Sequence, residues 1–160
     1  MADLAKIIDE ILAKEGTPTN DPDDRGGRTA YGISEKSNPL AWADSKVTEG
    51  EARAIYERKY IKFPKFDQVK DHQLQVQLID FGVTSGPQLA IMKLQAILNV
   101  EVDGEIGPKT LHALDGIFVP SINNRLVGAR VTMIGRIVKR NPSDIKYLVG
   151  WLERAVEFLL

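Results

Sequence analysis

The 160-residue sequence contains no cysteine and only two histidines and two tryptophans. The absence of cysteine excludes disulfide bonds and thiolate metal sites. No long apolar run occurs, and the first residues, Met1–Lys6, are not a basic leader, so we expect neither a signal peptide nor a membrane anchor. The net charge of −1 gives no overall basic excess for binding nucleic acid.

The charge that is present is unevenly distributed along the chain. Residues 121–160 carry seven Lys/Arg against three Asp/Glu, whereas residues 1–60 carry nine against twelve. A basic C-terminal quarter is compatible with contact to an anionic polymer. It is equally compatible with an ordinary solvated helix face, so the charge pattern alone leaves both interpretations open.

Apolar spacing predicts an all-α fold. Leu4, Ile7, Ile8, Ile11 and Leu12 form one face of an amphipathic helix that ends near Lys14. Thr48 and Glu51 have the spacing of a capping box, which predicts another helix start. Further helical patterns cover residues 74–81, 89–98, 126–138 and 145–159, and Pro108 is expected at a first helical position. The only candidate for β-structure is a small ribbon near residues 28–33.

The chain shows no repeat and no clear linker, and its weakest seam lies near Ser85–Pro87. We therefore expect two lobes, residues 1–85 and residues 86–160, packed together as one compact unit. With 43% hydrophobic residues, the chain has enough apolar side chains for such a core.

Glu15 stands at the expected end of the first helix, directly before the turn-forming residues 16–18. A carboxyl group there meets the negative end of the helix dipole, which favours the protonated form of such a group. A protonated carboxyl group next to a second carboxylate is the pair that hydrolysis of a glycosidic bond requires. Position alone is also compatible with an exposed residue at a helix end.

The loop after Glu15 holds the densest carboxylate cluster of the chain, formed by Asp21, Asp23 and Asp24. A loop running back from the helix could place Asp24 and Thr29 opposite Glu15, where Asp24 would handle a water molecule and Thr29 would hold it. Turn formation and capping are the simpler explanation for Asn/Asp-Pro stretches. A calcium loop is a further alternative, but the glycine and glutamate spacing of an EF-hand is absent, and no metal is expected.

The segment from Glu15 to Ile33 (EGTPTNDPDDRGGRTAYGI) resembles the opening motif of the glycoside hydrolase family 108 muramidases. Five further segments resemble that family and the peptidoglycan-binding half that usually follows its catalytic part, in the same order along the chain: Thr48–Tyr60, Asp80–Gly86, Leu94–Gln95, Val102–Thr110 and Gly150–Arg154. This sequence departs from the family pattern at Thr17, Pro18, Arg25 and Thr84.

The resemblance implies a lysozyme-like fold, no cofactor, and cleavage of the β-1,4 bond between N-acetylmuramic acid and N-acetylglucosamine. Glu15 matches the catalytic glutamate of the family, and its spacing to Asp24 and Thr29 resembles a Glu/Asp/Thr arrangement of phage-type lysozymes. The substrate-binding residues expected from the motif are Asn20, Asp21, Tyr31 and Thr84. Tyr31 could equally be a packing residue, and Asp80 is expected to pair with an arginine rather than to catalyse.

Two alternatives to this hydrolase remain open. A lytic transglycosylase also needs a glutamic acid but no second carboxylate, and a non-catalytic wall-binding protein would use only the C-terminal half. The resemblance further implies a phage endolysin, expected as a monomer made in the host cytoplasm. It would act on the periplasmic peptidoglycan of a Gram-negative host, lyse the cell, and need a holin-type helper to reach the wall. Bacterial glycan strands are its expected partner, with no nucleic acid.

Overall fold

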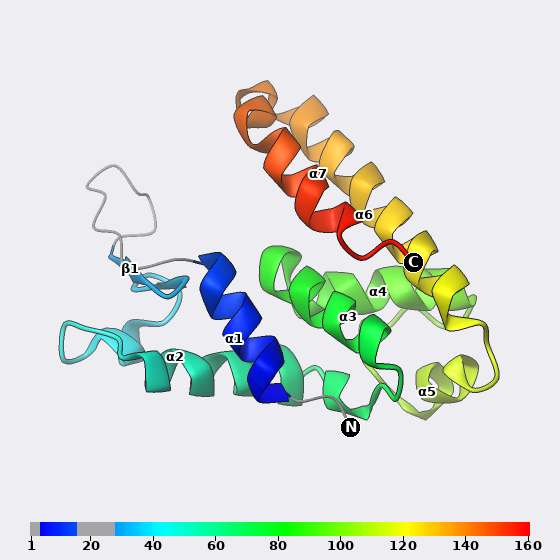
Figure 1. Cartoon of the computed structure of the whole chain (residues 1–160), viewed down its shortest axis with the longest axis horizontal. Coiled ribbons are helices and arrows are strands. Elements are labelled where there is room, and N and C mark those ends of the chain that lie inside the picture. The colour runs from blue at the N-terminus through cyan, green and yellow to red at the C-terminus, as the bar shows by residue number, and fades with distance from the viewer. Residues whose placement is uncertain (1–3, 16–27) are drawn as a thin grey trace. The chain divides into compact units, whose positions relative to one another are not determined.

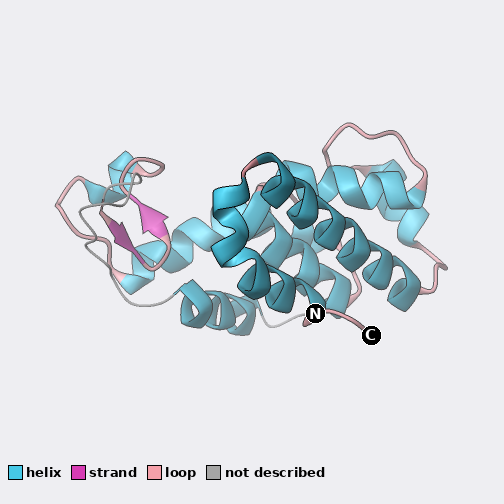
Figure 2. Ribbon diagram, turned by 90° about the horizontal axis from the view of Figure 1, so that it is seen from above, coloured by secondary structure: helices cyan, strands magenta, loops and turns pink. Residues whose placement is uncertain are grey.

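The computed structural model describes residues 4–15 and 28–160 of the chain. Their packing divides the chain into two compact units, Met1–Phe63 and Pro64–Leu160, which are described separately below. The described residues are mainly helical, with one two-stranded hairpin (Figures 1 and 2), which confirms the all-α fold with a small ribbon. None of the helices in these residues is long and apolar enough to cross a membrane.

In its described residues, 4–15 and 28–63, the first unit contains three helical segments, one hairpin and one 3₁₀ turn. Their bounds are α1 Leu4–Glu15, β1 Thr29–Ala30, β2 Ile33–Ser34, η1 Pro39–Trp42, α2 Glu49–Tyr56 and the π-helical segment η2 Glu57–Lys62, which continues α2. The apolar face expected for α1 is buried.

A capping box starts α2, as the sequence predicts. The Thr48 hydroxyl accepts a hydrogen bond from the Glu51 amide at 3.3 Å, and the Glu51 carboxylate accepts one from the Thr48 amide at 2.7 Å. Arg53, one turn further on, forms ion pairs with Asp9 of α1 and Glu49 of α2. The helix that carries Tyr56 is thereby tied to the helix that ends in Glu15.

The hairpin pairs Thr29 with Ser34 and Ala30 with Ile33, leaving Tyr31 and Gly32 as a two-residue turn. Both turn residues have positive φ, 53° and 74°. This combination defines the type I′ turn, whose twist matches that of antiparallel strands. Glycine is favoured there, but a tyrosine at positive φ is strained.

The second unit is built around α3 His72–Ser85. The other elements, in chain order, are η3 Phe66–Gln68, α4 Pro87–Leu98, α5 Pro108–Leu114, α6 Val119–Arg140, η4 Pro142–Tyr147 and α7 Leu148–Val156. Gly86, with φ 92°, turns the chain between α3 and α4, which lie side by side (Figure 1). The fully buried side chains of Leu74, Leu78, Ile79 and Phe81 put α3 at the core of this unit.

Candidate active site

Glu15 is the last residue of α1, and its side chain is partly buried. The hairpin turn packs against it. A Cβ atom added to Gly32 would lie 3.1 Å from both Cβ and Cγ of Glu15 and would overlap the Tyr56 hydroxyl. Only a residue without a side chain fits between these groups, so Gly32 lets the turn approach the carboxyl-bearing side chain closely.

Tyr56 and Tyr60 form the helical side of this site. The buried Tyr56 hydroxyl donates a hydrogen bond to the Tyr31 carbonyl at 3.0 Å, and the two tyrosine rings lie 5.5 Å apart. Burial raises the pKa of Tyr60, and the negative charge of Glu15 raises it further. Tyr60 therefore keeps its proton at neutral pH and remains a neutral hydrogen-bond donor close to the Glu15 carboxylate.

The Tyr56–Tyr31 hydrogen bond explains the strained turn. A non-glycine residue at positive φ persists only where its surroundings hold it there. Here a buried hydroxyl from α2, 25 positions along the chain, holds the Tyr31 carbonyl. The Tyr31 side chain itself is partly exposed, and its contact with a sugar stays a prediction.

The other residues predicted from the loop are only partly within the described structure. Thr29 lies in β1, two residues before the turn, and is partly buried. Asn20, Asp21 and Asp24 lie outside the described residues, so the assignment of Asp24 as second carboxylate stays a prediction. Sequence reasoning missed Gly32 and the two tyrosines as parts of the site, although the four-residue spacing of Tyr56 and Tyr60 on a predicted helix was a usable signal.

Thr84, predicted to contact substrate, lies in the second unit, at the end of α3. The Thr84 hydroxyl donates a hydrogen bond to the Asp80 carbonyl at 3.1 Å and accepts one from the Arg130 guanidinium at 3.1 Å. These bonds give Thr84 a structural role in this unit. A substrate contact of Thr84 stays a prediction.

Asp80 pairs with two arginines, which confirms the expected arginine partner. Its carboxylate lies 2.7 Å from Arg130 of α6 and 2.9 Å from Arg154 of α7. Arg130 is 2% exposed and Asp80 is 4% exposed. Burial lowers the pKa of Arg130, and the charge of Asp80 opposes that shift. A buried carboxylate needs such partners, so the pair joins α3 to the two C-terminal helices.

Metal chemistry finds no support in the part of the chain that the structure describes. No group of three or more His, Asp or Glu residues there is arranged to hold a metal ion. The carboxylate cluster at residues 21–24 falls outside those residues, and the expectation that it binds no metal stays a prediction.

Comparison with known proteins identifies both parts of the chain. Residues 8–86 match the family described as Glycosyl hydrolase 108, and residues 89–156 match the Predicted Peptidoglycan domain. A solved structure of Brucella abortus SagA is similar over 97% of this chain and 90% of its own, with 29% identity and a TM-score of 0.77. Among proteins with curated descriptions, none matches significantly.

The family match and the packing place α3 differently. By sequence, α3 belongs to the glycosyl hydrolase part, which ends at residue 86. By packing, it belongs to the second unit, which begins at Pro64. The Asp80 ion pairs therefore connect the glycosyl hydrolase part of the sequence to the peptidoglycan part. The lobe boundary at 85/86 stays a prediction.

Proposed function

The chain belongs to the glycosyl hydrolase 108 family and carries a peptidoglycan-binding half, and from this we propose that it hydrolyses the β-1,4 bond between N-acetylmuramic acid and N-acetylglucosamine with Glu15 as the acid. That it is a glycoside hydrolase acting on peptidoglycan follows from the family. The bond and the residues are the proposal.

The observation that supports Glu15 is its setting. The strained turn packs against the side chain of Glu15, and Tyr60 lies beside it. Because Gly32 has no side chain, the turn can approach Glu15 closely. Strained backbone of this kind is concentrated at functional sites. Glu15 also lies within the segment that matches the hydrolase family.

In the proposed reaction, Glu15 donates its proton to the glycosidic oxygen as the bond from that oxygen to the anomeric carbon breaks. Water supplies a hydroxyl group to the anomeric carbon. The carboxylate that activates the water takes its remaining proton, and proton exchange with solvent restores the protonated Glu15. A second carboxylate activates the water or stabilises the positive charge that develops on the sugar. We assign this role to Asp24, with Thr29 holding the water, and substrate contacts to Asn20, Asp21, Tyr31 and Thr84.

The test of the acid is Glu15→Gln, which keeps the size of the side chain and removes its acidity. We expect activity on purified peptidoglycan to fall by at least about 10²-fold, the usual contribution of a general acid. Glu10→Gln, an exposed position on the same helix, is the matched control and should retain activity. Equal activity of Glu15→Gln and Glu10→Gln would reject the assignment.

The second carboxylate is tested by comparing Asp24→Ala with Asp21→Ala. We expect the larger loss of activity for Asp24→Ala. A severe loss in Asp21→Ala with an active Asp24→Ala would move the role to Asp21.

The biological setting is part of the same proposal and is supported by the resemblance to phage endolysins. We propose a monomer that lyses Gram-negative cells from within once a holin-type protein opens the inner membrane. Expression in a Gram-negative host with and without such a protein tests this, because lysis should require both. Lysis by the chain alone would contradict the need for a helper.

A further inference from the structure

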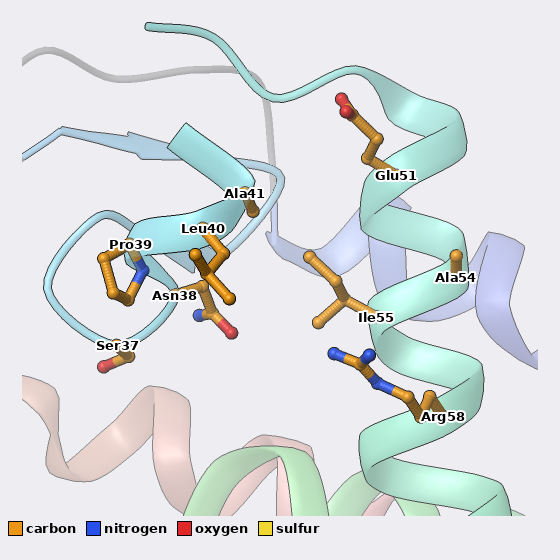
Figure 3. Close-up of a pocket in the computed structure, with 9 residues that line it drawn as sticks. All are labelled: Ser37, Asn38, Pro39, Leu40, Ala41, Glu51, Ala54, Ile55 and Arg58. Atoms are coloured by element: carbon orange, nitrogen blue, oxygen red, sulfur yellow. The ribbon is translucent and has the colours of Figure 1, made fainter. Parts of the chain in front are cut away.

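A pocket of about 550 Å³ lies in the first unit between η1 and α2, on a surface that the proposed reaction does not use. Its volume is typical of sites for small ligands. Asn38 and Leu40 line one side, and Glu51, Ala54, Ile55 and Arg58 line the other (Figure 3).

The pocket has an apolar wall. Leu40 and Ile55 face each other across it (Figure 3), and Leu40 is 92% exposed. Leu40 sits on the 3₁₀ turn that Pro39 starts. An exposed leucine opposite a second apolar side chain offers a contact for a small apolar group.

The pocket also contains a cation, Arg58. The Arg58 guanidinium points into it (Figure 3), and Arg58 forms no ion pair among the described residues. Glu51, on the same wall, keeps its negative charge, because the Thr48 amide and hydroxyl both donate to its carboxylate at 2.7 Å and lower its pKa. These bonds hold the Glu51 carboxylate at the start of α2, about two turns before Arg58. Arg58 is therefore available to bind an acidic group.

An acceptor faces this cation. The side-chain amide nitrogen of Asn38 donates a hydrogen bond to the Ser34 carbonyl at 3.4 Å. The amide oxygen of Asn38 then lies on the Arg58 side of the pocket (Figure 3). The pocket thus combines a carboxylate binder, an acceptor for an N–H group and a small apolar wall. None of the described lining residues is aromatic, so the pocket offers no flat ring for the face of a sugar.

We propose that this pocket binds the acidic stem peptide of peptidoglycan, with Arg58 on a peptide carboxylate, Asn38 on a peptide N–H, and Leu40 and Ile55 around an alanine methyl group. The proposal rests on the proposed function, since the stem peptide is attached to the N-acetylmuramic acid next to the scissile bond. Of the components of the wall, the peptide supplies all three groups.

The position of the pocket on the helix suits this role. Glu51, Ala54, Ile55 and Arg58 have the spacing of one helical face, whereas Tyr56 and Tyr60, beside Glu15, fall on another face of the same continuous helix. A helix with its side chains is about 10–12 Å wide. A short peptide can span that width from a sugar bound at Glu15.

The test compares two substrates: sacculi with their stem peptides, and the same sacculi after an amidase has removed the peptides. The measured quantity is the ratio of kcat/KM on the first substrate to that on the second. We expect the wild type to prefer the peptide-bearing wall and Arg58→Gln to lower the ratio about tenfold, the effect of losing one charge-assisted hydrogen bond. Leu40→Ser should lower it less.

Lys36→Gln is the matched control, because it removes one positive charge from an exposed position of the same unit that does not line the pocket. It should keep the wild-type ratio. If Arg58→Gln leaves the ratio unchanged, or lowers activity on both substrates equally, the pocket does not bind the stem peptide and the proposal is overturned.

A binding measurement separates this proposal from the proposed function. The full chain, isotope-labelled, is titrated with the free stem peptide released by the amidase. Backbone NMR signals of Ala54, Ile55 and Arg58 should shift in the wild type and not in Arg58→Gln. No shift in the wild type rejects the peptide site even in an active enzyme, and shifts in an enzyme inactive on both substrates reject only the proposed function.

Discussion

The two units of the chain treat their polar groups differently. In the second unit, two networks join buried polar side chains: Asp80 binds Arg130 and Arg154, and Gln95 binds four groups of the 103–110 segment. The buried Gln77 of the same unit has no hydrogen-bond partner among the described residues. In the first unit, Tyr31 is held in a strained turn, Leu40 is exposed, and Arg58 lacks an ion pair among the described residues.

This difference distinguishes residues that stabilise the fold from residues that are expected to act on the substrate. Satisfied networks of buried polar groups stabilise a core, whereas strained backbone costs stability and is concentrated at functional sites. We therefore expect the Asp80 and Gln95 networks to contribute mainly to stability, and substitutions at the hairpin turn beside Glu15 to affect activity more than stability. The predictions below test that division.

The largest stability effect is expected for Asp80→Ala. Removing the carboxylate leaves the buried Arg130 without its counter-charge, so the free energy of unfolding should fall by about 3–5 kcal/mol. Chemical denaturation followed by circular dichroism measures this. The exposed Lys70–Asp115 pair of the same unit is the control, and Lys70→Ala should change stability little. Similar effects of the two substitutions would show that the Asp80 network does not stabilise the unit.

A second prediction compares two fully buried glutamines of the second unit. Gln95→Met removes the hydrogen-bond partner of the Gly104 amide, among other groups. The free energy of unfolding should therefore fall by at least about 1–3 kcal/mol. Gln77 has no hydrogen-bond partner for either amide atom among the described residues. Gln77→Met should therefore be neutral or stabilising, because it removes an unsatisfied buried amide.

Thermal denaturation of the two methionine variants provides the readout. A lower melting temperature for Gln95→Met than for Gln77→Met supports the distinction between satisfied and unsatisfied amides. The opposite order would contradict it.

A third prediction concerns the first unit, where Gly32→Ala should lower the free energy of unfolding by about 1–2 kcal/mol because of the positive φ. Its effect on activity should be larger than its effect on stability, since the new methyl group displaces Glu15 or Tyr56. Gly50→Ala is the control, because a Cβ there meets nothing within 4 Å. Equal activity of Gly32→Ala and Gly50→Ala would contradict the close approach of the turn to Glu15.

Local patterns predict which segments of this fold are helical and some of the helix boundaries. The range predicted from residue 126, for example, begins at Val119 in the structure. The apolar spacing of residues 4–12 and the Thr48–Glu51 box give the starts or faces of α1 and α2, and Pro108 begins α5 as expected. These signals depend on residues within one or two turns of each other. The sequence alone is therefore enough to recognise them.

The site depends on long-range contacts, and the sequence predicts it only in part. A tyrosine is not favoured at positive φ, and the hydroxyl that holds Tyr31 comes from Tyr56, 25 residues away. Likewise, the need of Asp80 for an arginine is readable, but the choice of Arg130 and Arg154 requires the packing of α6 and α7. The catalytic role of Glu15 is likewise predicted from the family motif, because its position at a helix end is also compatible with an exposed residue.

Mass spectrometry of the products of peptidoglycan digestion tests the central claim most directly. The account predicts fragments that have gained one water molecule at a new N-acetylmuramic acid reducing end with the wild type, and no such fragments with Glu15→Gln. Fragments with a 1,6-anhydro end and no added water would identify a lytic transglycosylase. Intact glycan strands with the wild type would leave only wall binding, and either result would contradict the proposed hydrolysis.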